Sequence, residues 1–316
     1  MRVLVAGAGA LGSVFGGFLR RAGLDVTLLG RAGHLDAIAQ RGLTIDGIWG
    51  AHHLEGFAVA TEVAALHGRF DAILVPVKSY DTRAMAESVA PFLATEGVAI
   101  SLQNGLGNVE TLEAVVGPER ALGARVIFGA TLPAPGQARV TVFADPTALG
   151  ALAPGRHPRR DAAARRWAAI IDGAGVPAVA TDGLAALLWA KVFYNAALNP
   201  LGALLGVHYG ALPEHAESRA LMDHVIDEAF AVASAEGVTL PWVNPAEYQQ
   251  EFYGRLVPAT YDHRSSMLQD LERGRRTEID AINGAVWHRG AERGINTPVN
   301  ETLTRLVHAV EAIRDA

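Results

Sequence analysis

Two lysines stand out in this 316-residue chain, whose 27 basic residues comprise 25 arginines and only Lys78 and Lys191. Lys191 lies in the apolar segment 187–199, where the polar residues Lys191, Asn195 and Asn199 recur every fourth position, on one stripe of a helix. Burial lowers the pKa of an ammonium group toward the range in which it can deliver a proton, whereas a guanidinium stays protonated. The stripe therefore predicts a general acid flanked by amides. A lysine that merely reaches the surface is the simpler interpretation, but it leaves both asparagines unexplained.

A buried ammonium needs a partner, and Glu278 is the best-placed carboxylate in the sequence. Thr277 is expected to cap a helix over 278–289, which puts Glu278 in the first turn and on one face with Ile282 and Val286. The helix dipole also favours an acid in the first turn, and this would explain Glu278 without catalysis.

A second polar pair lies upstream of this glutamate. Ser266 and Asp270 are four residues apart in the segment 265–270. They form either a local helical hydrogen bond or contacts to a substrate.

A glycine-rich turn is expected to bind a dinucleotide. The motif follows an apolar strand, 2–6, and opens a helix, 10–22; its residues are Gly7, Gly9, Ala10, Leu11 and Gly12. Three glycines at this spacing allow a tight turn, a close approach of pyrophosphate and a close helix–strand contact. In a chain with 34 glycines the bare pattern is weak, so the prediction depends on the strand before it and the helix after it.

The end of the second strand, 25–29, favours NADPH over NADH. An NAD enzyme would carry an acid there to bind the ribose 2′-hydroxyl, but the chain reads Leu28-Leu29-Gly30-Arg31. The planar guanidinium of Arg31 can bind a 2′-phosphate. A surface arginine without a ligand is the alternative in so arginine-rich a chain.

Two polar residues follow the next buried strands. Lys78 comes after the apolar run 71–77, and Asn104 after 97–102. In doubly wound sheets ligands bind beyond the carboxyl ends of the strands, so both side chains are expected where nicotinamide and substrate meet. Either residue alone would be read as a solvated lysine or an Asn-Gly turn.

The chain is expected to be an α/β protein with an N-terminal Rossmann-type doubly wound sheet and a C-terminal all-helical domain. Residues 1–181 alternate short strands with helices and form the predicted NADP-binding domain. Residues 182–316 read as helices and form the predicted substrate and catalytic domain. The segment 153–160 is expected to be a surface loop. Further strands are predicted at 43–48, 56–60, 125–130, 139–143 and 176–180, and helices at 161–172, 182–198, 218–236, 244–256, 265–272 and 300–314.

Composition excludes several other classes of protein. The formal net charge of −6 argues against nucleic acid or an anionic membrane as a partner, and zero cysteines exclude disulfides and thiolate sites. The histidines show no metal-ligand spacing, so no metal is expected. The longest apolar run, 185–205, is interrupted by polar residues and proline, so it predicts a buried helix rather than a membrane span. We expect a cytoplasmic protein, either a monomer or a homodimer.

Taken together, these motifs resemble the ketopantoate reductase (2-dehydropantoate 2-reductase) family over nearly the whole chain. The motifs, in order, are Gly7-Ala8-Gly9-Ala10-Leu11-Gly12, Lys78, Gln103-Asn104-Gly105, Leu188-Trp189-Ala190-Lys191 with Asn195 and Asn199-Pro200, Ser265-Ser266-Met267-Leu268-Gln269-Asp270 and Arg276-Thr277-Glu278-Ile279-Asp280-Ala281-Ile282-Asn283-Gly284. The two C-terminal motifs are far more specific than the glycine turn.

The resemblance implies NADPH-dependent reduction of 2-dehydropantoate to (R)-pantoate, a step toward pantothenate and coenzyme A. It makes Lys191 the general acid at the C2 carbonyl oxygen and Glu278 the group that orients Lys191 and the substrate hydroxyl. The residues it places around the substrate are Asn104, Asn195, Asn199 and Ser266, with Arg31 and Lys78 facing the cofactor. Binding between the two domains would exclude water during hydride transfer.

Two departures from the family pattern concern the substrate. Gly202 stands where the family often has threonine, and Tyr194 adds bulk to a usually aliphatic segment. Reduction of another 2-oxo acid therefore stays open. A β-hydroxyacid dehydrogenase would share the layout but should carry a substrate-binding glycine-serine loop, which is not found. A non-catalytic NADPH sensor is the remaining alternative, and the buried polar stripe argues against it.

Overall fold

The computed structural model describes residues 1–314, which form two compact units. The first unit comprises residues 1–104 and 108–184, and the second begins at residue 185. Residues 105–107 belong with the second unit. Their attachment there includes a hydrogen bond of 2.8 Å from the Leu106 N–H to the carbonyl oxygen of Ala281.

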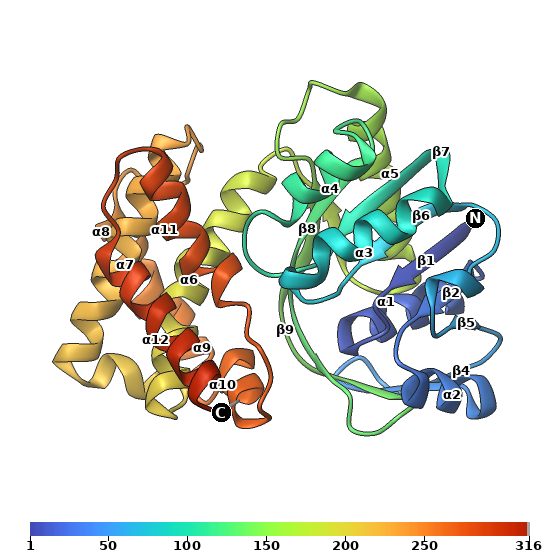
Figure 1. The fold of residues 1–316 in the computed structure, drawn as a ribbon, viewed down its shortest axis with the longest axis horizontal. Helices are drawn as coiled ribbons and strands as arrows, with labels where there is room; N and C mark the ends of the chain where they lie inside the picture. Colours follow the sequence, from blue (N-terminus) through green and yellow to red (C-terminus); the bar gives the residue numbers. More distant parts are fainter. Residues whose placement is uncertain (315–316) are drawn as a thin grey trace. The chain divides into compact units, whose positions relative to one another are not determined.

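The first unit is built on a ten-stranded, mostly parallel sheet (Figure 1). The strand order is β4-β3-β9-β8-β7-β6-β1-β2-β5, and β10 pairs with β9. Only the β3–β4 and β8–β9 pairs are antiparallel among the described residues. The strands are β1 (Arg2–Ala6), β2 (Asp25–Leu29), β3 (Leu43–Gly47), β4 (His52–Leu54), β5 (Ala58–Ala60), β6 (Phe70–Val75), β7 (Leu93–Ser101), β8 (Ala121–Thr131), β9 (Gln137–Gly150) and β10 (Ala178–Ala180).

Helices cover both faces of this sheet, and β1 shows the consequence. Val3 and Val5 belong to one apolar core, together with residues of α1 and α5. Leu4, between them, belongs to a second core with residues of α3 and α4. Successive strand residues point to opposite faces, so the central strand is apolar throughout. The helices are α1 (Ala10–Arg21), α2 (Ala32–Arg41), α3 (Thr82–Val89), α4 (Asn108–Val116) and α5 (Pro158–Ala174).

The α1 helix lies unusually close to the sheet because it carries glycines on its inner side. A Cβ atom at Gly16 would be 2.8 Å from a methyl carbon of Leu28, and one at Gly17 would be 2.4 Å from Ile45. Both distances are too short for real contacts, so a larger residue at either position would require the side chain of Leu28 or Ile45 to move.

The second unit is helical (Figure 1). Its helices are α6 (Leu184–Leu205), α7 (Ala216–Ala235), α8 (Pro245–Glu251), α9 (Val257–Ala259), α10 (Ser266–Glu272), α11 (Asn283–Glu292) and α12 (Pro298–Arg314). Aromatic rings join three of these helices, because Phe193 of α6 lies 5.7 Å from Phe230 of α7 and 5.2 Å from Tyr248 of α8. The α/β fold with a Rossmann-type first unit and a helical second one is therefore confirmed.

Two predicted helices have different ends. The helix expected to stop at Leu198 continues through Pro200 to Leu205, because Leu201 and Ala203 are buried and extend its apolar side. The helix expected over 244–256 is interrupted: α8 ends at Glu251, and a π-helical turn, Phe252–Leu256, follows.

The segment predicted as a surface loop, 153–160, is also corrected. The α5 helix begins within it, at Pro158, and the side chain of Arg160 is 1% exposed. Its guanidinium donates to the carbonyl oxygens of Pro118, at 2.9 Å, and Ala153, and it lies 3.3 Å from the Asp161 carboxylate. A buried guanidinium is tolerated because it has these acceptors.

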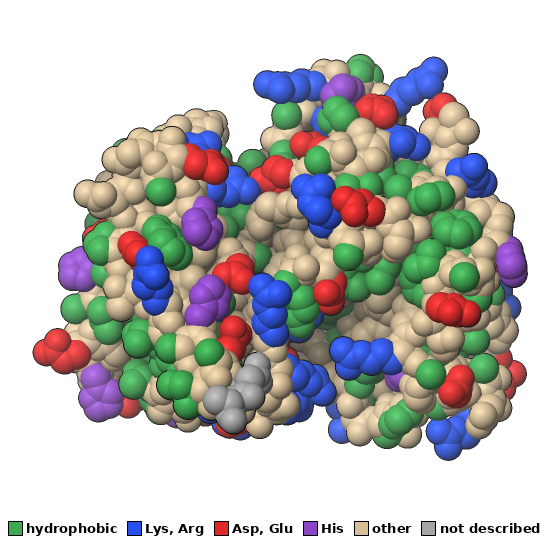
Figure 2. Space-filling view, in the orientation of Figure 1, with side chains coloured by type: hydrophobic (Ala, Val, Ile, Leu, Met, Phe, Trp, Pro, Cys, Tyr) green, Lys and Arg blue, Asp and Glu red, His purple; other side chains and the backbone are tan. Residues whose placement is uncertain are grey.

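Among residues 1–314, no helix is long and apolar enough to cross a membrane. On the face drawn in Figure 2, basic and acidic side chains are interspersed over the described residues.

Candidate functional site

The predicted cofactor residues of the first unit lie at one edge of its sheet. The carboxyl end of β1 pairs with that of β2 through Ala6 and Leu29, and β6 pairs with β7 through Val75 and Ser101. Gly7, Arg31, Lys78 and Asn104 follow these four strands within one to three residues. The parallel register therefore brings the four positions to the same edge, as the sequence predicts.

Glycine occupies the three positions of the turn for different physical reasons. Gly7 has a φ of +131°, and a Cβ there would be 2.8 Å from Val77. At Gly12 a Cβ would be 2.2 Å from the Gly7 carbonyl oxygen. Both residues must be glycine for the turn itself to form.

Gly9 is different, because a Cβ atom there would meet no protein atom within 4 Å. The turn does not need glycine at this position for packing. Gly9 is also the N-cap of α1 and offers no side chain to its first N–H groups. Open space in front of unpaired N–H groups at a helix N-terminus is what a pyrophosphate requires. The residues present therefore fit a bound dinucleotide.

His34, which sequence reasoning missed, braces the start of α1. One ring nitrogen, Nδ1, accepts a hydrogen bond of 3.1 Å from the Gly136 N–H, so the proton is on Nε2, which lies 2.9 Å from the Ser13 hydroxyl. Ser13 is fully buried and directly follows the glycine turn. Burial lowers the pKa of His34, which keeps the ring in the neutral form that this geometry needs.

Arg31 is exposed at the N-cap of α2, directly after β2. Lys78 is half-buried and precedes a short 3-10 turn, Ser79–Asp81. The end of β2 carries no acid in the structure either, since Leu29 and Gly30 lead straight into Arg31.

A buried hydrogen-bond network holds the loop that carries Asn104. The Gln103 amide donates to the Thr82 hydroxyl at 2.6 Å and accepts from the Ser101 hydroxyl at 3.0 Å. Thr82 in turn donates to Asn108, whose side chain donates to the Asn104 carbonyl oxygen at 2.8 Å. Sequence reasoning assigned a role only to Asn104 of this network, because the network depends on Thr82, which is 21 positions from Gln103 and 26 from Asn108.

In the second unit, the polar stripe of α6 lies as predicted on one helix. Asn195 and Asn199 are 8% and 5% exposed, and Lys191 is half-buried. Within residues 1–314 no protein group hydrogen bonds to the side-chain amide of Asn195. The Asn199 side chain accepts a hydrogen bond of 2.5 Å from the Tyr209 hydroxyl. A buried amide without a protein partner is costly in a finished core and is expected where a ligand supplies the partner.

Glu278 is buried, but the predicted local structure around it is wrong. Glu278 precedes a 3-10 turn, Ile279–Ala281, and α11 begins only at Asn283. Ile282 has a non-helical backbone with φ −108° and ψ −94°, so Glu278 is not in the first turn of an α-helix. The predicted face of Glu278, Ile282 and Val286 is therefore not one helical face, although all three residues are buried.

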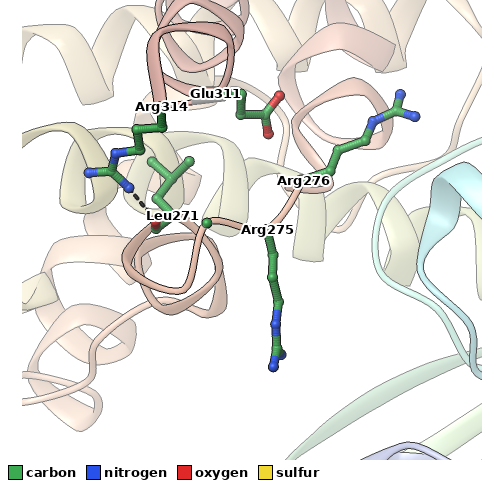
Figure 3. Close-up of a pocket in the computed structure, with 6 residues that line it drawn as sticks. Leu271, Arg275, Arg276, Glu311 and Arg314 are labelled. Atoms are coloured by element: carbon green, nitrogen blue, oxygen red, sulfur yellow. Dashed lines mark hydrogen bonds between the residues drawn. The ribbon is translucent and has the colours of Figure 1, made fainter. Parts of the chain in front are cut away.

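A carboxylate from α12 supports the segment before Glu278. Glu311 accepts a hydrogen bond of 2.6 Å from the Thr277 N–H, and Thr277 is fully buried. Glu311 also lines a cavity of about 150 Å³ together with Leu271, Gly274, Arg275, Arg276 and Arg314 (Figure 3). The three guanidinium groups point in different directions rather than converging on one point, as Figure 3 shows.

A second buried network ties the Glu278 segment to the lysine helix. The Asn283 side chain donates to the Ala196 carbonyl oxygen of α6 and to the Asn300 side chain, both at 3.0 Å. Asn300 donates to the Glu228 carboxylate of α7 at 2.7 Å. Ala196 lies between the two stripe asparagines, so this network fixes the position of their helix.

Ser266, the remaining predicted substrate residue, is exposed at the start of α10. The neighbouring Ser265 is buried: it caps α10 by accepting from the Leu268 N–H at 3.0 Å, and it donates to the Asn199 carbonyl oxygen at 3.4 Å. The fold thus connects the serine motif to the α6 stripe through Ser265.

The first unit has an open glycine turn at the edge of a parallel sheet, and the second has a half-buried lysine in line with two buried asparagines on one helix. Both features are typical of nucleotide-dependent reductases with a helical second domain. Family models agree: residues 3–154 match the model described as ketopantoate reductase PanE/ApbA, and residues 184–311 match its C-terminal model. The chain belongs to the ketopantoate reductase family.

Curated relatives match over nearly their full length. The chain is 36% identical to the 2-dehydropantoate 2-reductase of Aquifex aeolicus, with 98% of this chain and 97% of the relative covered. It is 34% identical to that of Archaeoglobus fulgidus, with 98% of each covered.

Solved structures with the same fold include two different activities. A PanE/ApbA family ketopantoate reductase from Ralstonia eutropha has a TM-score of 0.88 at 34% identity, with both chains fully covered. A D-mandelate dehydrogenase solved with NADH and anilino(oxo)acetate also has a TM-score of 0.88, at 27% identity and full coverage.

The glycine turn yields a matched pair of variants. Gly9→Ala adds a methyl group to open space, so we expect an unchanged melting temperature but about tenfold weaker binding of NADPH, the dinucleotide expected from the sequence, as loss of about 1.5 kcal/mol of phosphate contact would give. Gly12→Ala places the same methyl group against the Gly7 carbonyl, so we expect it to lower the free energy of unfolding by about 1–3 kcal/mol. Calorimetry and NADPH fluorescence titration measure both; equal effects of the two variants on binding and stability would contradict the assignment.

His34 predicts a pH dependence of stability. Burial lowers its pKa in the folded chain from 6.5, so the unfolded chain takes up the proton first as the pH falls. The stabilisation that the neutral His34 ring gives the folded chain is complete above pH 6.5. It is lost progressively as the pH drops from 6.5 toward the lowered pKa. The free energy of unfolding is measured in urea at pH 7.5, 6.5 and 5.5. Between pH 7.5 and 5.5 it should fall less in His34→Ala than in the wild type. The pKa of His263 is also lowered by burial, so part of the pH-dependent loss of stability should remain in His34→Ala. Parallel pH profiles for wild type and His34→Ala would rule out this role.

Proposed function

We propose that the chain is an NADPH-dependent oxidoreductase that reduces 2-dehydropantoate to (R)-pantoate, the step that leads toward pantothenate and coenzyme A. The observation that carries the proposal is the α6 stripe, in which a lysine precedes two buried amides in a chain aligned from end to end with 2-dehydropantoate 2-reductases. The glycine turn with open space at Gly9 supports a dinucleotide cofactor.

The cofactor would be held by the first unit. Its pyrophosphate would lie at the N-terminus of α1, against Gly7, Gly9, Ala10, Leu11 and Gly12, and Arg31 would bind the 2′-phosphate. Lys78 and Asn104 follow β6 and β7, where the nicotinamide end is expected. When bound, the reduced nicotinamide supplies the hydride for the C2 carbonyl carbon.

The residues of the second unit would manage the charge that develops on oxygen. The Lys191 ammonium donates a proton to the C2 oxygen, and Glu278 holds that ammonium and the substrate hydroxyl. Asn195, Asn199 and Ser266 would hydrogen bond to the substrate. Preformed donors in a site with little water stabilise the developing alkoxide more than water would.

A second candidate substrate is an aryl 2-oxo acid. It is favoured by the structural similarity to D-mandelate dehydrogenase. The chemistry is the same, hydride to C2 and a proton to its oxygen, so the two candidates differ in the pocket and not in the mechanism. The cytoplasmic location and the monomeric or dimeric state stay predictions.

The substrate is tested by NADPH oxidation with a panel of 2-oxo acids that includes 2-dehydropantoate and phenylglyoxylate. We expect the highest kcat/KM with 2-dehydropantoate. A higher value with phenylglyoxylate would replace the proposed substrate, and no turnover of any member would overturn the proposed function. In the same assay Lys191→Ala should lower kcat by at least ~10²-fold, as loss of a general acid does, while NADPH still binds.

Lys191→Arg is the matched variant for that role. It keeps the positive charge but cannot deliver a proton, so we expect a comparable loss of kcat. Retained turnover in Lys191→Arg would mean that the charge alone is needed, and retained turnover in Lys191→Ala would refute the mechanism.

Arg31 predicts the choice of cofactor. A guanidinium–phosphate pair contributes about 1.5–3 kcal/mol, so Arg31→Ala should raise the KM for NADPH by about tenfold or more. The KM for NADH, which lacks the phosphate, should change by less than about twofold. Steady-state kinetics with both cofactors decide this, and equal effects on the two would refute the 2′-phosphate role. Arg41→Ala, in the last turn of α2, is a control for loss of a surface charge.

A further inference from the structure

The hydroxyl of Tyr209 is the protein partner of the Asn199 side chain. Tyr209 begins a short 3-10 helix, Tyr209–Glu214, and its side chain is 3% exposed. Its hydroxyl lies 2.5 Å from Oδ1 of Asn199. Neither Tyr209 nor its position was singled out in the sequence, because the two residues are ten positions apart and the helix ends between them.

The direction of this hydrogen bond follows from what else is available. A phenol needs one acceptor for its proton, and Oδ1 of Asn199 is the acceptor that the described residues offer it. Burial raises the pKa of Tyr209 well above its usual value, so the phenol keeps that proton. The amide oxygen therefore faces Tyr209, and the NH₂ group must face the other way.

The NH₂ group of Asn199 has no acceptor among residues 1–314. It is also not one of the fully buried unpaired atoms of this part of the chain, which are Arg125 Nε, Thr147 Oγ1, Asn283 Oδ1 and Thr297 Oγ1. Asn199 thus presents two N–H donors to space that a ligand can reach, one helical turn after the unpaired amide of Asn195. A pair of donors suits a carboxylate.

Gly202 leaves room for this contact. A Cβ atom there would lie 3.9 Å from the Tyr209 ring and 3.3 Å from the Val207 carbonyl oxygen. A longer branched side chain at 202 would press on the ring that holds Asn199. The small residue at 202 and the tyrosine at 209 are therefore parts of one local arrangement.

We propose that Tyr209 is a positioning residue that fixes the orientation of the Asn199 amide, so that its NH₂ group donates to the carboxylate of the 2-oxo acid. The inference rests on the proposed function for the identity of the substrate. It also accounts for substrate specificity. The oriented Asn199 side chain offers only N–H donors to the substrate, so it favours a 2-oxo acid over the corresponding 2-oxo amide, whose NH₂ group would need an acceptor.

Tyr209→Phe removes the hydroxyl and keeps the ring, which frees the Asn199 amide to rotate. We expect the KM for the 2-oxo acid to rise about tenfold and kcat to change by less than about threefold, because the loss is in substrate binding. Binding of NADPH should be unchanged. The preference for the acid over its amide, measured as the ratio of kcat/KM values, should narrow.

Tyr194→Phe is the matched control. Tyr194 is the neighbouring aromatic residue, with its ring 5.8 Å from that of Tyr209, and its hydroxyl also forms a hydrogen bond in the interior, a partly buried one of 2.5 Å with the Thr260 hydroxyl. It touches neither stripe asparagine through that hydroxyl, so its KM should stay within twofold of the wild type. Equal effects of the two variants would show that loss of any buried hydroxyl suffices and would overturn the proposal.

A double-mutant cycle tests whether Tyr209 acts through Asn199. In the Asn199→Ala background, Tyr209→Phe should change KM by less than twofold. A tenfold effect in that background would overturn the proposal. The cycle uses whichever 2-oxo acid the wild type reduces, so failure of 2-dehydropantoate as substrate does not decide the role of Tyr209.

A measurement without substrate covers the case in which no 2-oxo acid is reduced. The side-chain amide signals of Asn199 in ¹⁵N NMR spectra are identified by their absence in Asn199→Ala. They should keep their position in Tyr194→Phe, and shift and exchange with water faster in Tyr209→Phe. Unchanged Asn199 signals in Tyr209→Phe would overturn the proposal whatever the enzyme's substrate.

Discussion

The hydrogen bond from Asn283 to the Ala196 carbonyl oxygen is the constraint on which the second unit depends. It joins the segment that carries Glu278 to α6, at a point between Asn195 and Asn199. The same asparagine reaches Asn300, and through it Glu228 of α7, so four helices meet at one buried polar centre. Although Oδ1 of Asn283 has no partner among the described residues, its NH₂ group is paired twice, and a network of this kind favours one arrangement of the helices where an apolar core would tolerate several. The network therefore fixes the position of α6 through the backbone of Ala196, and it does not engage the side-chain amides of Asn195 and Asn199.

Much of this could be predicted from the sequence, because the signals were local. The strand 2–6, the glycine turn and the α1 helix follow one another without a gap, and their order alone defines the dinucleotide-binding edge. The α6 stripe is a spacing of four between polar residues in a long apolar segment, which indicates a helix. The bounds of α6 were harder. Pro200 is a strong signal for a helix end, but burial of Leu201 and Ala203 outweighs it, and sequence propensity does not measure burial.

What could not be predicted was long-range. Arg160 reads as part of a basic surface turn, yet it is buried because the carbonyl oxygens of Pro118 and Ala153 converge on it in the fold. The backbone around Glu278 departs from a helix because Thr277 is held by Glu311, 34 positions away. His34 and Tyr209 were missed for the same reason: each acts on a residue of the predicted site from a different element. The residues proposed to do the chemistry thus form a pattern in the sequence, whereas those that hold them in place form almost none.

The chain has lysine at only two positions, Lys78 and Lys191, and both belong to the predicted site. The chain uses arginine where a permanent charge and several hydrogen-bond donors are needed. Examples are Arg160, which donates to the carbonyl oxygens of Pro118 and Ala153, and Arg139, which makes two hydrogen bonds to the Asp46 carboxylate. At a strand end near the predicted nicotinamide site and on a buried helix, the chain has lysine instead. A guanidinium would bring a permanent charge that cannot deliver a proton. An ammonium is compact and can change its protonation state, so lysine at these two places is consistent with the proposed reductase chemistry.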